Sequence, residues 1–163
     1  METITEVTEL TKEQLAQKYI KKHMIGAMAA ALIPAPGIDL AAVAGVQIKM
    51  LAGMSKIYNV PFKENRAKNI IAALAGSFGA SAMATGLVAS AVKIIPIFGQ
   101  LGGAMALPLV AGASTYAVGK VFVQHFESGG TFLDFDPEKT REYFAQKLTE
   151  GQKVAADLRE AGK

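Results

Sequence analysis

A long stretch almost free of charge is the feature of this sequence that most restricts its fold. Residues 69–119 carry one formal charge, at Lys93. A surface helix of a soluble domain shows a charged face, so an uncharged block of this length indicates burial by lipid or by other protein surfaces. Only 19% of the residues are charged, against about 25% in typical soluble domains. The first question is therefore which of the two surrounds this block.

Proline-containing turns divide the apolar regions into helices. Pro34, Pro36 and Gly37 interrupt the first apolar run, and Pro96 and Gly99 interrupt the second. Proline lacks an amide donor and disfavours helical dihedrals in the residue before it. The sequence predicts an all-α fold and a single domain over residues 1–163. Its parts are a first helical hairpin (11–58), an apolar second hairpin (61–127) and a soluble C-terminal helical segment (131–163).

Local signals predict where the outer helices begin. Thr11 and Gln14 have the spacing of a capping box, in which each side chain bonds an amide of the other residue. Asp136 followed by Pro137 predicts an N-cap and first helical residue, opening an amphipathic helix that runs to about Ala161.

The first helix is expected to be amphipathic in its first half. Leu15, Tyr19, His23 and Ala27 fall on one apolar stripe, with the lysines off it. Residues 24–33 are wholly apolar, and ten such residues rise about 15 Å, half of a bilayer's hydrocarbon core.

The second hairpin has the length of a transmembrane pair. Residues 70–92 are uncharged and would form a helix of about 35 Å. Residues 94–119 are also uncharged, with Pro108 expected to bend the helix they form. We expect this hairpin to enter or span a membrane.

Small residues are frequent in the predicted helices and suggest close helix packing, including homo-oligomerisation. The candidates are Gly45, Gly53, Gly76, Gly79, Ala80, Ala84, Gly86, Gly102, Gly103, Gly112 and Gly119.

No pattern in the sequence predicts catalysis, a cofactor or a metal. Cysteine is absent, which removes thiolate chemistry and cysteine zinc sites. Residues 114–121 resemble the end of a P-loop but lack its first glycine and final hydroxyl residue. Asp134, Asp136 and Glu138 have the spacing of a calcium loop, without its glycine or its final acid. His23 and His125 have no partner at metal-ligand spacing.

Three polar residues in apolar surroundings form a candidate polar site: Asp39, Gln47 and Lys49. We interpret Asp39 as the N-cap of the second helix and Gln47 as a hydrogen-bonding link between helices. In the alternative interpretation the three residues face a polar path through an oligomeric pore or transporter.

The proline turns and the residues after them resemble a known family. Residues 33–39 (Ile-Pro-Ala-Pro-Gly-Ile-Asp), with Gln47 and Met50 following and residues 116–119 later, are similar to the bacterial domain-of-unknown-function 697 family. The resemblance covers roughly residues 20–130. It implies a membrane-associated module of the kind often fused to, or encoded beside, a dynamin-like or Ras-like GTPase. It implies no catalytic residues.

The leading hypothesis is a non-enzymatic membrane scaffold that oligomerises and serves a partner, plausibly a GTPase. The net charge of +3 is too dispersed for a nucleic-acid surface. More basic residues flank the second hairpin, at positions 56, 63, 66, 68 and 120, than lie at its tip, where Lys93 is alone. The positive-inside rule therefore places both termini in the cytoplasm, at a bacterial inner membrane. The alternatives are the pore and a soluble oligomeric α-bundle or cage.

Overall fold

The fold is all-α, as the sequence predicts. A computed structural model describes residues 10–32, 38–84 and 103–162, which contain five helices and no strand. The helices are α1 (Lys12–Ala30), α2 (Ile38–Ile57), α3 (Glu64–Ala84), α5 (Gly103–Glu127) and α6 (Arg141–Ala161).

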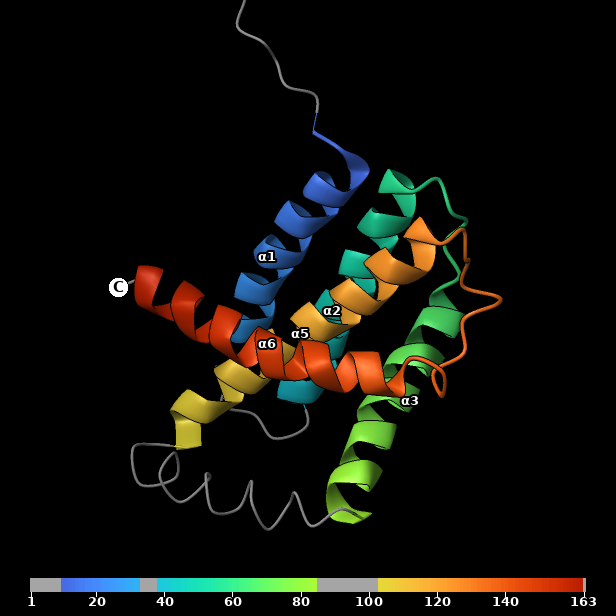
Figure 1. Cartoon of the computed structure of the whole chain (residues 1–163). Coiled ribbons are helices and arrows are strands. Elements are labelled where there is room, and N and C mark those ends of the chain that lie inside the picture. Colours follow the sequence, from blue (N-terminus) through green and yellow to red (C-terminus); the bar gives the residue numbers. More distant parts are fainter. Residues whose placement is uncertain (1–9, 33–37, 85–102, 163) are drawn as a thin grey trace, which may run out of the picture.

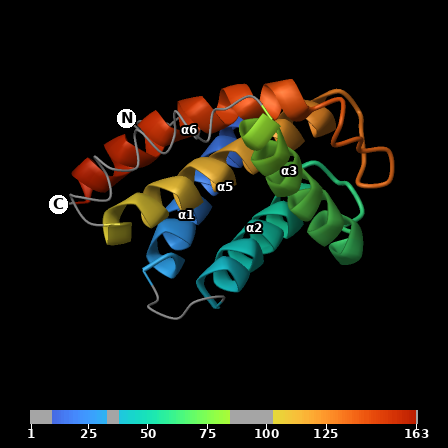
Figure 2. The same ribbon diagram turned by 90° about the horizontal axis from the view of Figure 1, so that it is seen from below.

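Helix α5 lies at the centre of the structure (Figures 1 and 2). It packs most extensively against α6 and α1, while α2 packs against α1 and α3 packs against α2 and α6. Its second half is almost continuously buried, with Val121 and Phe122 fully enclosed. Helix α6 crosses α5 and buries Phe144, Leu148 and Ala155, so the predicted amphipathic helix has its apolar face covered.

The predicted first helix start is confirmed, and that of α6 is wrong. Thr11 and Gln14 form both hydrogen bonds of the capping box. Helix α6 begins at Arg141 instead of Pro137. Asp136 Oδ1 accepts a hydrogen bond from the Glu138 amide, 3.0 Å away, so Asp136 closes a turn that precedes the helix.

The apolar stripe expected for α1 is confirmed at His23 and Ala27, whereas near its start Ala16 and Ile20 are buried instead of Leu15 and Tyr19. The buried residues of this helix are Ala16, Ile20, His23, Met24 and Ala27. Leu15 is 40% exposed, because α2 and α5 cover α1 along a line that passes beside it.

No described helix combines the length and the apolar composition that a membrane span requires. The expected transmembrane hairpin at 61–127 thus finds no support in these helices. The uncharged parts of these helices that the structure describes are residues 69–84 of α3 and 103–119 of α5. Helix α5 continues past the uncharged residues to Glu127, the last residue predicted for the second hairpin.

Candidate functional site

Charge is distributed along the bundle so that one end has almost none. The C-terminal halves of α1 and α3 and the N-terminal halves of α2 and α5 lie toward the same end of the molecule (Figure 1). In these half-helices, described residues 24–32, 38–48, 69–84 and 103–119, the only formal charge is that of Asp39. We name this part the apolar end.

The opposite halves of the same four helices form a charged end. They contain nine lysine or arginine residues and three glutamates. This end is therefore strongly basic, although the chain as a whole has a net charge of only +3.

Large apolar side chains are exposed at the apolar end. Ile25 is 57% exposed and Leu32 62% exposed, both from α1 or the residues just after it. Val110 of α5 is 58% exposed and lies in the uncharged half of that helix. Side chains of this size in water are costly when they gather on one surface, so the apolar end has the properties of a contact surface.

A hollow of about 420 Å³ lies between α1 and α2 at the charged end. Leu15, Lys18, Tyr19 and Lys22 line it from α1, at spacings of three, four and seven residues that place them on one face. Gly53, Lys56 and Ile57 line it from α2.

Glycine brings the two helices close together at the hollow. A Cβ atom on Gly53 would overlap the Tyr19 ring and its hydroxyl group, so this glycine allows the ring to lie against the α2 backbone. Seven residues after Tyr19 in α1 and seven residues before Gly53 in α2, a Cβ on Gly26 would lie 3.7 Å from Val46 Cγ1. The two contacts show that α1 and α2 run antiparallel with the hollow and the apolar end on the same pair of helices.

The lysines of the hollow have no counter-ions among the described residues. Elsewhere Lys68 pairs with Glu64 at 3.0 Å and Lys147 with Glu150 at 2.7 Å. No ion pair involves Lys18, Lys22 or Lys56 within the described part of the chain, and no carboxylate lines the hollow there. The hollow is therefore an electropositive site.

The candidate polar residues do not share one environment. Gln47 is 4% exposed, and its amide nitrogen donates to Ser114 Oγ at 3.0 Å and Thr115 Oγ1 at 3.2 Å. This is the link between helices expected for Gln47, here joining α2 to α5. Lys49 is exposed. Asp39 lies in the first turn of α2, which begins at Ile38, and its side chain lies outside the described residues.

The small residues fall into three groups. Gly53, Gly112 and Gly119 face side chains of α1 at distances that a Cβ would violate, so they pack helices within one chain. A Cβ added to Gly45 or Gly76 would meet no described atom within 4 Å. Four more of these residues lie in helices, but the surroundings of their side chains are outside the described part: Gly79, Ala80, Ala84 and Gly103. The remaining predicted residues lie wholly outside the described residues: Gly86, Gly102, Pro34, Pro36, Gly37, Pro96 and Gly99.

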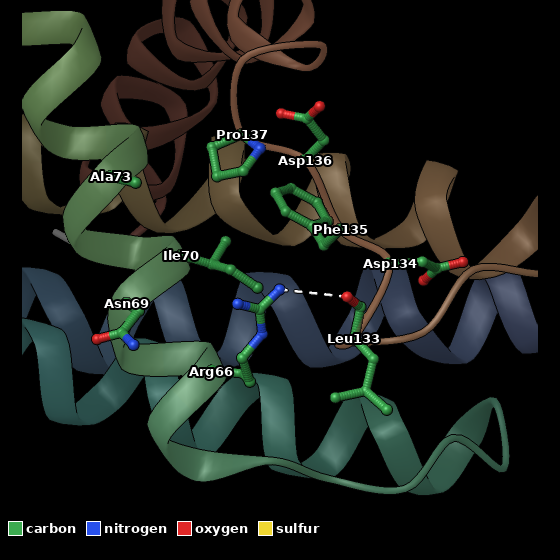
Figure 3. A pocket seen from close by; sticks show the side chains of 9 residues that line it. All are labelled: Arg66, Asn69, Ile70, Ala73, Leu133, Asp134, Phe135, Asp136 and Pro137. Atoms are coloured by element: carbon green, nitrogen blue, oxygen red, sulfur yellow. Dashed lines mark hydrogen bonds between the residues drawn. The ribbon is translucent and has the colours of Figure 1, made fainter.

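A second hollow, of about 440 Å³, lies between α3 and the loop before α6 (Figure 3). Arg66 points into it and donates from Nη2 to the Leu133 carbonyl oxygen at 3.2 Å and from Nε to that of Phe132 at 3.3 Å. The carboxylates of Asp134 and Asp136 point away from Arg66. The guanidinium thus holds the loop in place, which makes this hollow a part of the loop's packing.

The residues with calcium-loop spacing have structural partners. Asp134 Oδ1 accepts from the Thr131 amide at 2.6 Å and lies 3.3 Å from His125 Nε2. The hydrogen bond from the Thr131 amide is the main cause that lowers the pKa of Asp134 below its ordinary value. No group of three metal-binding side chains occurs among the residues that the structure describes.

An ionised group links α5 to α6. Glu150 accepts hydrogen bonds from Lys147 and from the Tyr116 hydroxyl. These bonds, that of Lys147 first, lower the pKa of Glu150. Burial and the bond to Glu150 raise the pKa of Tyr116.

Comparison with known proteins assigns the family. The family model described as "Domain of unknown function (DUF697)" matches residues 2–153. The chain belongs to this family. "Magnetosome membrane protein 22" of Magnetospirillum gryphiswaldense is 34% identical over 148 residues, covering 91% of this chain and 76% of that protein. No solved structure matches significantly. The resemblance inferred from the proline turns and Gln47 is confirmed across almost the whole DUF697 chain.

Sequence reasoning did not single out the exposed stripe of α1. Leu15, Lys18, Lys22, Ile25, Ala29 and Leu32 are all exposed. Their alternating spacing of three and four residues is the signal that marks one helix face, but the same spacing fits the adjacent buried stripe equally well.

Proposed function

We propose that this DUF697 chain is a non-enzymatic accessory protein that attaches to a membrane by inserting its apolar end. The observation that carries the proposal is the collection of four uncharged half-helices at one end, with Ile25, Leu32 and Val110 exposed there. The 34% identical relative bears the name of a magnetosome membrane protein, which supports a membrane location for this chain also.

The dimensions suit entry into one leaflet. From Lys22 to Leu32 the chain advances ten residues, or about 15 Å, half of the hydrocarbon thickness. Exposed apolar side chains would lie in the acyl region, and the lysines of the charged end would lie at the depth of the headgroups. Anionic headgroups attract such lysines by about 1 kcal/mol each.

The basic charged end sets the orientation. Lysine and arginine next to inserted segments favour the cytoplasmic side. We place the charged end, and with it both termini, on the cytoplasmic face of a bacterial inner membrane. The transmembrane arrangement of residues 61–127 is the finer form of this proposal.

Oligomerisation and a GTPase partner extend the proposal. Gly45 and Gly76 are exposed on α2 and α3, and a Cβ added to either would meet no described atom within 4 Å, so their backbones are open to a second copy. The charge-rich outer face of α6 is then available to a soluble partner. The pore hypothesis has less support, because Gln47 is buried and bonded to α5 instead of facing a path with Lys49.

Membrane attachment is tested first by extracting native membranes with alkaline carbonate. We expect the full chain to stay in the pellet. Release into the supernatant would refute insertion and favour the soluble bundle or cage.

A labelling experiment then tests which end inserts. The sequence contains no cysteine, so Leu32→Cys and Leu133→Cys each provide one attachment site for an environment-sensitive fluorophore. Both positions are exposed, at 62% and 67%. We expect vesicles to shift the emission of the label at position 32 to the blue and to leave that at position 133 unchanged. The reverse pattern would contradict the proposed orientation.

A further inference from the structure

The lysine hollow between α1 and α2 has the composition of a binding site for a multiply charged anion. Lys18, Lys22 and Lys56 converge on it from two helices. These lysines line one hollow that has no carboxylate among its described lining residues, and such a surface attracts an anion. The unpaired state of these lysines among the described residues therefore points to a ligand.

The hollow also offers a hydroxyl group and an apolar wall. The Tyr19 ring lies over Gly53 at the floor of the hollow, and no hydrogen bond of its hydroxyl is found among the described residues. Leu15 and Ile57 line the same space, and Leu15 is 40% exposed. A ligand that fits all of these groups has a charged part for the lysines and an apolar part beside them.

We propose that this hollow binds the headgroup of a membrane lipid that ends in a phosphate monoester. A phosphate monoester carries a charge of about −1.5 to −2 near neutral pH and three acceptor oxygens, which matches three ammonium groups. A phosphodiester headgroup has one charge and two free oxygens, and leaves part of the lysine charge unneutralised. This inference rests on the proposed function, because it takes the membrane as the source of the ligand.

The position of the hollow favours a lipid over a soluble phosphate. Lys22 precedes Ile25 by less than one helical turn on the same exposed face. When Ile25 and Leu32 enter the acyl region, the lysines of the hollow are held at headgroup depth. A lipid bound there would direct its chains along the apolar end.

The test compares vesicles that differ only in the type of phosphate. One set is phosphatidylcholine with phosphatidic acid, a monoester, and the other is phosphatidylcholine with enough phosphatidylglycerol, a diester, to give the same surface potential. The full chain, Lys18→Gln/Lys56→Gln and the control Lys12→Gln/Lys63→Gln are titrated with each. Both double variants lose the same charge, and all four lysines are exposed, so folding, checked by circular dichroism, is expected to be unchanged.

We expect the full chain to bind the monoester vesicles about tenfold more tightly than the diester vesicles, which is about the effect of one additional charge-assisted hydrogen bond. The Lys18→Gln/Lys56→Gln variant should lose this preference and the control should keep it. Equal binding of both vesicles by the full chain would overturn the headgroup site and leave membrane attachment intact. Binding to neither would overturn membrane attachment as well. Competition by millimolar glycerol phosphate that abolishes the preference would overturn the lipid as the source.

Discussion

The exposed apolar residues of α1 provide the most direct measure of insertion. The double change Ile25→Ser/Leu32→Ser removes two large apolar side chains from the apolar end without opening the core, because they are 57% and 62% exposed. Isoleucine and serine have similar helix propensities, and Leu32 lies beyond the C-cap of α1 at Ala31. Folding stability should therefore change by less than about 0.5 kcal/mol.

The expected loss of membrane affinity follows from the exposed fractions. Burying a whole leucine or isoleucine side chain contributes roughly 1.5–3 kcal/mol. Insertion buries only the part that the fold leaves exposed, about three fifths for each residue. The two changes together should cost roughly 2–3.5 kcal/mol, which corresponds to a dissociation constant raised roughly 20-fold to 400-fold.

Flotation of the protein with vesicles over a range of lipid concentrations measures this constant. Leu133→Ser is the matched control, because Leu133 is the most exposed large apolar residue in the described part of the chain at 67% but lies in the loop after the charged end of α5. An unchanged affinity in the double variant would refute insertion of the apolar end. An equal loss of vesicle affinity in the control would show that exposed apolar side chains promote binding wherever they lie on the protein.

Two further predictions concern contacts between α5 and α6. Gly151→Ala should destabilise the fold by roughly 1–2 kcal/mol in urea unfolding, because a Cβ there would lie 2.8 Å from the Ala113 carbonyl oxygen, and this strain outweighs the gain in helix propensity. Glu150→Gln should destabilise the protein at neutral pH. The difference in free energy of unfolding between this variant and the natural sequence should shrink as the pH falls below the ordinary glutamate pKa of about 4.5. The reason is that the lowered pKa of Glu150 stabilises the fold only while the carboxylate is ionised.

Each of these has its own control. Gly45→Ala meets nothing within 4 Å and should stabilise α2 by about 0.5–1 kcal/mol; a similar gain at position 151 would contradict the close packing of α5 and α6. For Glu150, unfolding is followed between pH 3 and pH 7 as a function of urea. A difference between the two proteins that stays constant over this range would show that the bonds from Lys147 and Tyr116 do not depend on ionisation.

Much of the local structure could be predicted from the sequence. The capping box at Thr11 could be predicted from the spacing of two residues. The link through Gln47 could be predicted because this residue is polar within an apolar run. The start of α6 was wrong because Asp136 and Pro137 are equally suited to a helix and to the turn that they form here. The buried stripe of α1 was predicted correctly at His23 and Ala27 but not at Leu15 and Tyr19, because neighbouring stripes have nearly the same composition and only contacts with α2 and α5 decide between them.

The sequence by itself determined that the chain is helical, which halves of α1, α2, α3 and α5 lack charge, and that it belongs to a family linked to membranes. These properties depend on neighbours along the chain. Only the tertiary structure decided that the four uncharged halves meet at one end and that Lys18 and Lys22 of α1 converge with Lys56 of α2. The physical reason is that this arrangement depends on the direction and register of packed helices, which contacts such as Tyr19 with Gly53 fix between residues far apart in the sequence.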